Sequence, residues 1–86
     1  MPVLSKFYGI VIRMLSARVR TPRFHAIYGQ SELVVEIPSL RIVTGTAPAR
    51  VCELVLEWAA QHQRELLEAW NRVCRAQPPP QIAPLQ

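Results

Sequence analysis

The hydrophobic pattern of this chain changes its period once, between residues 44 and 48, and this change strongly constrains the fold. Before it, apolar and polar residues alternate, as in half-buried β-strands. After it, apolar residues recur every three or four positions, as on one face of an α-helix. The segment between, Thr44-Gly45-Thr46-Ala47-Pro48, contains a glycine and a proline that is tolerated in the first turn of a helix. The sequence therefore predicts strands followed by helix, an α+β fold.

The N-terminal half contains strand-like segments separated by short turns. The expected strands cover residues 7–15, 23–28, 31–37 and 40–44. Gly29-Gln30 and Pro38-Ser39 have the composition of tight turns, so neighbouring strands should pair antiparallel. We therefore predict an antiparallel meander of about four strands, with the C-terminal half packed on it.

Two-residue turns fix the register of the strands, and the register assigns side chains to faces. The expected opposite pairs are Phe24–Val35, Ala26–Leu33, Val35–Ile42, Ile37–Leu40, Arg23–Glu36, Glu36–Arg41, His25–Val34 and Ile27–Glu32. Phe24 and Ala26 would then face the core, and Arg23 and His25 would lie on the opposite, open face. A three-residue turn would invert this assignment.

The C-terminal half predicts one long helix or two shorter helices ending near Ala76. A single helix would span roughly 40 Å and overhang a four-stranded sheet, whereas a bend near residues 61–63 would remove the overhang. Three prolines at residues 78–80 end the helix. The expected division is an α+β domain over residues 1–77 and a Pro-rich tail over 78–86, in which Ile82 and Leu85 either dock or remain free.

All the excess positive charge lies in the N-terminal half. Residues 1–44 contain six basic side chains and two glutamates, whereas residues 45–86 contain four of each. No acidic residue interrupts the arginines at the centre of this basic region, which are Arg13, Arg18, Arg20 and Arg23. Such a patch attracts nucleic-acid phosphates or an acidic protein, and the alternative is a solvated basic loop.

Several classes of protein are disfavoured by what the sequence lacks. No apolar run approaches the roughly 20 residues that a membrane-spanning helix needs. No phosphate-binding glycine loop and no paired His/Cys metal spacing is present. Cys52 and Cys74 are interpreted as small apolar residues in a reducing compartment. We expect a cytoplasmic protein without a cofactor or a metal site.

The residues with the most suggestive chemistry are His25, Tyr28 and Arg23. Histidine titrates near neutral pH, tyrosine can transfer a proton, and arginine stabilises charge on phosphate. If the protein is an enzyme, these groups suit a metal-independent ribonuclease, in which the 2′-hydroxyl of RNA attacks the adjacent phosphate. The other interpretation is that His25 is a polar residue on the open face of the sheet.

Three segments resemble a small bacterial family, the domain-of-unknown-function 4160 family. They are Lys6-Phe7-Tyr8-Gly9-Ile10-Val11-Ile12, Phe24-His25-Ala26 with Tyr28-Gly29, and Leu56-Glu57-Trp58 with His62, Glu65-Leu66 and Trp70, and the resemblance extends to Ile82-Ala83-Pro84-Leu85. Members usually carry a further histidine directly before the phenylalanine, where this chain has Arg23. A fixed cation thus replaces a titratable group, which disfavours a two-histidine metal or acid–base site.

The resemblance implies a partner, because members are typically encoded beside a domain-of-unknown-function 2442 protein in an arrangement similar to a toxin–antitoxin pair. We therefore expect the basic, toxin-like half of a two-protein module, contacting RNA through its N-terminal basic face. The alternatives are a non-catalytic DNA-binding regulator, a protein-interaction adaptor, or a domain that forms homo-oligomers through its helix and tail.

Overall fold

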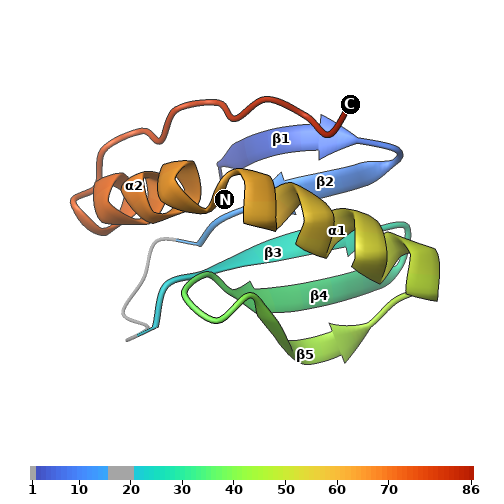
Figure 1. Cartoon of the computed structure of the whole chain (residues 1–86). Helices are drawn as coiled ribbons and strands as arrows, with labels where there is room; N and C mark the ends of the chain where they lie inside the picture. Colours follow the sequence, from blue (N-terminus) through green and yellow to red (C-terminus); the bar gives the residue numbers. More distant parts are fainter. Residues whose placement is uncertain (1, 16–20) are drawn as a thin grey trace.

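Five strands form one antiparallel sheet, and two helices follow them in the chain (Figure 1). The computed structural model describes residues 2–15 and 21–86. The elements are β1 (Val3–Phe7), β2 (Ile10–Arg13), β3 (Arg23–Tyr28), β4 (Ser31–Glu36), β5 (Arg41–Thr46), α1 (Ala49–Gln61) and α2 (Gln63–Cys74). The strands lie in the sheet in the order in which they occur in the sequence, so the sheet is a simple meander. The predicted α+β class and antiparallel meander are confirmed.

The extra strand comes from the N-terminal apolar segment, which was expected to be one strand over residues 7–15. It is instead broken by a turn at Tyr8 and Gly9, which joins β1 to β2 as a hairpin. Both turn residues have positive φ, +50° at Tyr8 and +79° at Gly9. Two consecutive residues in this region are typical of the tight turns that match the twist of a hairpin. The apolar pattern continues across the turn and hides it in the sequence.

The register at the centre of the sheet is the predicted one. Phe24 lies opposite Val35 and Ala26 opposite Leu33, and all four side chains are buried in the core. Val35–Ile42 and Glu36–Arg41 are also paired as expected. The expected Ile37–Leu40 pair is wrong, because residues 37–40 form the turn itself, with Leu40 at a φ of +56°.

The last strand, β5, continues past the expected end at Thr44 to Thr46 and is irregular. Its pairing with β4 shifts between Val34 and Val35, so that Val43 is an extra residue. Gly45 has a φ of +93° and lies opposite Leu33. A side chain at Gly45 would collide with the backbone oxygen of Glu32, which explains why this strand position holds a glycine.

The helical half is two helices, which confirms the alternative with a bend at residues 61–63. His62, with φ of −124° and ψ of 24°, ends α1 and precedes α2. Both helices lie on the same face of the sheet (Figure 1). Their apolar stripes enter one core with the sheet, centred on Trp58, which packs against Phe7 and Phe24 with ring centroids 5.4 and 5.8 Å away. Neither helix is long and apolar enough to cross a membrane.

The C-terminal tail returns across the molecule to the outer side of β1 (Figure 1). The backbone N–H of Ile82 donates to the carbonyl oxygen of Leu4 at 2.9 Å, and Ala83 O accepts a 2.8 Å bond from Trp58 Nε1. Ile82 and Leu85 are both buried in the core cluster. Of the two states left open for these residues, the structure therefore has the docked one.

Candidate functional site

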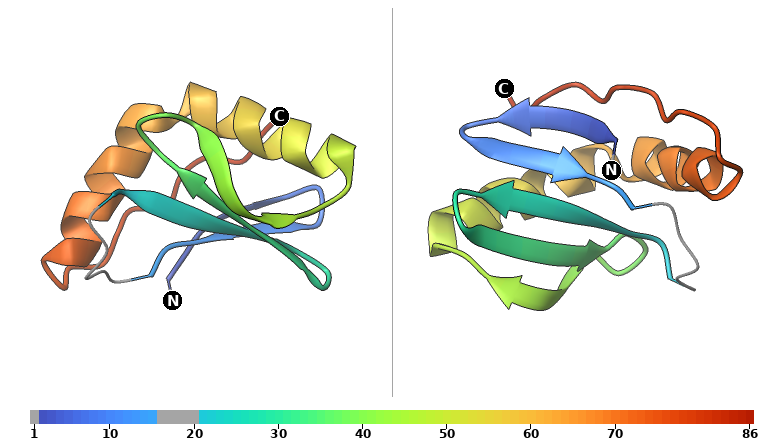
Figure 2. Two further views of the ribbon diagram at one scale, coloured as in Figure 1. Left: turned by 90° about the horizontal axis from the view of Figure 1, so that it is seen from below. Right: turned by 180° about the vertical axis from the view of Figure 1, so that it is seen from behind.

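The two faces of the sheet differ in what covers them. Figure 2 shows α1, α2 and the tail gathered on one side of the sheet, while none of the described helices or strands lies over the other side. Side chains that point to this second side come from alternate positions of the strands, starting with Arg23 and His25 of β3. We call this side the open face.

Arg13, His25 and Arg23 form a basic group at one end of the open face. Arg13 lies directly opposite His25 across the β2–β3 pair, and Arg23 is two residues before His25 on the same strand. Residues at these directly opposite and next-but-one positions are neighbours on one face of a sheet. The structure thus brings together three of the residues that the sequence nominated, from two adjacent strands.

Both arginines have a buried Nε atom. The Nε atoms of Arg13 and Arg23 are buried and make no hydrogen bond to the part of the chain that the structure describes. Arg23 reaches Glu36 through a different nitrogen, at 3.9 Å, so its pairing is loose. Buried N–H donors normally have an acceptor, so these two Nε atoms are exceptions among the described residues.

His25 is held in place by Glu32, a residue that sequence reasoning did not include in the site. Its Nδ1 lies 2.6 Å from Glu32 Oε2, and its side chain is only 13% exposed despite its place on the open face. A carboxylate at this distance orients the imidazole and favours a proton on Nδ1. The predicted register could have identified Glu32. His25 pairs with Val34, and Glu32, two residues before Val34 on β4, is therefore a diagonal neighbour of His25 on the same face.

The centre of the open face is apolar. Val11, Ile27 and Val34 are each half-buried there, and the register places Val34 opposite His25 and Lys6 opposite Val11. Of the expected opposite pairs Arg23–Glu36 and Glu36–Arg41, only the first forms an ion pair among the described residues. The face is thus an apolar strip with the basic group at one end and Lys6 at its side, on β1.

Tyr28 is not part of this group. Successive residues of a strand point to opposite faces, and Tyr28 follows Ile27 of the open face at the end of β3. Its ring packs over Gly9 of the neighbouring turn, with Cε1 3.4 Å from the position a Cβ of Gly9 would have. The structure therefore separates Tyr28 from His25, with which it was nominated as catalytic.

Two other nominated residues, Arg18 and Arg20, lie outside the described residues. Within residues 2–15 and 21–86, no group of three or more His, Cys, Asp or Glu side chains could hold a metal ion. The second histidine, His62, lies on the helical side, where its Nδ1 is 2.7 Å from Glu65 Oε1 and its ring is 5.5 Å from that of Trp58. It belongs to the helix break and not to the open face.

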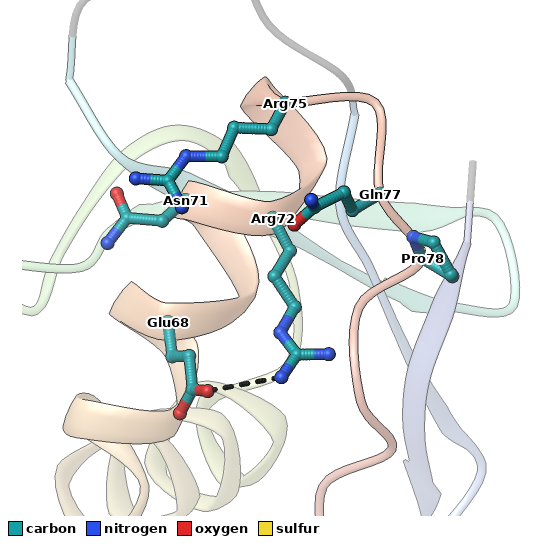
Figure 3. A pocket seen from close by; sticks show the side chains of 6 residues that line it. All are labelled: Glu68, Asn71, Arg72, Arg75, Gln77 and Pro78. Carbon is teal, nitrogen blue, oxygen red and sulfur yellow. Dashed lines mark hydrogen bonds and ion pairs between the residues drawn. The ribbon is translucent and has the colours of Figure 1, made fainter.

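A separate hollow lies at the C-terminal end of α2. It is lined by Glu68, Asn71, Arg72, Arg75, Gln77 and Pro78. Figure 3 shows the side chain of Arg72 directed to Glu68, with which it forms a 3.4 Å ion pair, while Arg75 extends back beside Asn71. The hollow has no histidine, so its residues lack a group that titrates near neutral pH.

Comparison with known protein families gives a match over most of the chain. The family model described as Domain of unknown function (DUF4160) matches residues 9–71. The chain belongs to this family. The DUF4160 match begins in the β1–β2 turn and ends within α2, so it includes the whole basic group and Glu32, while the motif at residues 82–85 lies outside it.

No curated protein and no solved structure matches the chain significantly. The DUF4160 assignment thus confirms the expected family and leaves the chemistry to be inferred from the open face itself.

Proposed function

We propose that this DUF4160 protein binds RNA through its open face and acts as the toxin-like half of a two-protein module in the bacterial cytoplasm. The observation that carries the proposal is the basic group, in which Arg13 and Arg23 lie beside His25 on a sheet face that no described helix or strand covers (Figure 2). Guanidinium groups bind phosphate oxygens through several N–H donors at once, which suits a nucleic-acid backbone.

The shape of the surface favours RNA over duplex DNA. Reading duplex DNA commonly uses a helix placed in the major groove, and both helices here are packed on the far side of the sheet from the basic group. An open antiparallel sheet can instead take an extended strand across its surface, as RNA-binding sheet domains do. The half-buried Val11, Ile27 and Val34 add an apolar strip that base rings can contact.

Binding is supported more strongly than cleavage. A ribonuclease site needs an acid and a base that both reach the scissile phosphate, one at the attacking and one at the leaving oxygen, and Tyr28 is separated from His25 by the sheet. His25 oriented by Glu32 remains a candidate base, with Arg13 and Arg23 as the groups that would stabilise phosphate charge. We propose metal-independent cleavage as the chemistry only if RNA bound to this face is found to be cut.

The binding proposal is tested by fluorescence anisotropy with a labelled RNA oligonucleotide over a range of salt concentrations. Arg13→Ala and Arg23→Ala should each weaken binding roughly ten-fold, since each loses a charge-assisted contact. Each should also lower the slope of log K against log salt by about 0.7, because one fewer counterion is released from a single strand. The matched control is Arg50→Ala, which removes an exposed arginine of α1 paired to Glu53.

Unchanged affinity and unchanged slope in both open-face variants, or an equal loss in Arg50→Ala, would contradict this assignment.

The toxin-like role is tested separately, by bacterial growth. Expression of the protein alone should arrest growth, co-expression with the neighbouring partner should relieve the arrest, and Arg13→Ala or His25→Ala should abolish it. Arrest that persists in both variants would remove the open face from the toxic activity.

A further inference from the structure

Two exposed tyrosines lie at the end of the sheet opposite the basic group. Tyr8 in the β1–β2 turn is 60% exposed, more than any other large hydrophobic side chain among the described residues, and Tyr28 before the β3–β4 turn is 39% exposed. Both turns lie at the same end, because Ile10 after the first turn pairs with Tyr28 before the second. These two side chains form an exposed aromatic surface at this end of the sheet.

The backbone at Tyr8 is strained. Its φ of +50° lies in the left-handed region, which a bulky side chain enters at a cost of about 1–2 kcal/mol. Glycine or asparagine would relieve this strain, yet the position holds an aromatic residue. Strain of this kind, at a residue that the core does not need, points to a functional reason for the side chain.

Neighbouring groups hold both tyrosine rings in place. Phe7, which is buried, meets Tyr8 edge-on, with ring centroids 6.4 Å apart and planes at 83°. The ring of Tyr28 packs against Gly9, the residue next to Tyr8. The two rings therefore flank one glycine and lose little freedom when another flat group binds them.

We propose that Tyr8 and Tyr28 form a stacking platform at the turn end of the sheet, where a single-stranded RNA whose phosphates lie on the basic group leaves the open face and places its unpaired bases on the two rings. This inference rests on the proposed function and specifies its substrate as single-stranded. Every base has an apolar face that stacks on an aromatic ring, so such a platform accepts any sequence. Bases inside a duplex are already stacked on both sides and cannot use it.

The dimensions and charge of the open face fit this substrate. Arg13 lies four residue steps after Gly9 along β2, which corresponds to about 14 Å of extended strand. A short segment of single-stranded RNA can therefore contact both the platform and the basic group. Lys6 lies between the two ends on the open face, opposite Val11, and supplies a cation along the path.

The test uses a fluorescein-labelled RNA decamer that does not self-pair, and the same decamer annealed to its complement. Tyr8→Gly is the central variant, because it removes the ring and relieves the positive φ, so the protein should fold at least as well as the parent. We expect about ten-fold weaker binding of the single strand. The salt slope should stay unchanged, because stacking releases no counterion, whereas Arg13→Ala should lower it. Tyr8→Phe is the matched control and should bind like the parent.

Each outcome distinguishes the platform from the proposed function. Weaker binding by Tyr8→Gly at an unchanged slope, together with preference for the single strand, supports the platform. Affinity within two-fold of the parent in Tyr8→Gly, or equal binding of duplex and single strand, overturns it while the arginine contacts stand. Loss of partner-protein binding in Tyr8→Gly with RNA affinity unchanged would assign the tyrosines to a protein interface and also overturns it. If the parent binds neither RNA, both the proposed function and the platform fall.

Discussion

Gly45 lies in edge strand β5 with a positive φ, directly against the backbone of Glu32. Gly45→Ala should lower the free energy of unfolding by about 2–4 kcal/mol. The new Cβ would clash with the backbone of β4, and alanine would also be strained at a positive φ. Urea denaturation followed by circular dichroism measures the change.

The matched control is Gly29→Ala, whose φ of +57° gives strain alone, since no atom lies within 4 Å of an added Cβ. It should cost about 1 kcal/mol. Equal losses at the two positions would contradict the clash.

At the scale of the elements, the C-terminal end of α2 has a left-handed backbone conformation that its alanine disfavours. Ala76 has a φ of +58°, while its N–H donates to Val73 O and the N–H of Gln77 donates to Arg72 O, the bonding that closes a helix in a left-handed residue. Glycine is preferred there because it has no Cβ. Ala76→Gly should therefore raise the free energy of unfolding by about 0.5–1 kcal/mol, measured as a shift of the urea midpoint.

Alanine to glycine in a helix interior is the control, because there it should lower the free energy of unfolding instead of raising it. Ala60 is exposed within α1, and Ala60→Gly should destabilise the protein by about 1 kcal/mol. A destabilising effect at both positions would show that the left-handed end of α2 is not what limits stability there.

At the scale of the whole molecule, the tail completes the core. Removing residues 81–86 should lower the free energy of unfolding by about 3–6 kcal/mol, because Ile82 and Leu85 lose their burial. Trp58 Nε1 would also lose its acceptor on Ala83. The loss is a large part of the stability of a small domain and should appear as a strong fall in Tm. Pro84→Ala, at an exposed tail position, is the control and should change Tm little.

The pairing of the strands at the centre of the sheet could be predicted from the sequence, whereas the first turn and the position of the tail could not. Gly29-Gln30 and the alternation around it determine the β3–β4 register, so Arg23 and His25 could be assigned to the open face. Tyr8 could not be identified as a turn residue, because an aromatic residue at positive φ violates local preference. The docking of Ile82 could not be decided either, since it depends on Leu4, at the other end of the chain.

The asymmetry between the two sheet edges has a consequence for association between molecules. The edge of β5 is interrupted by the extra residue Val43, and the edge of β1 is covered by the tail through Ile82. An irregular edge and a covered edge both resist the strand-to-strand addition that leads to aggregates. Loss of the tail would therefore remove a shield as well as buried surface, and the shortened chain would acquire an uncovered edge along β1 at which fibrillar growth can start.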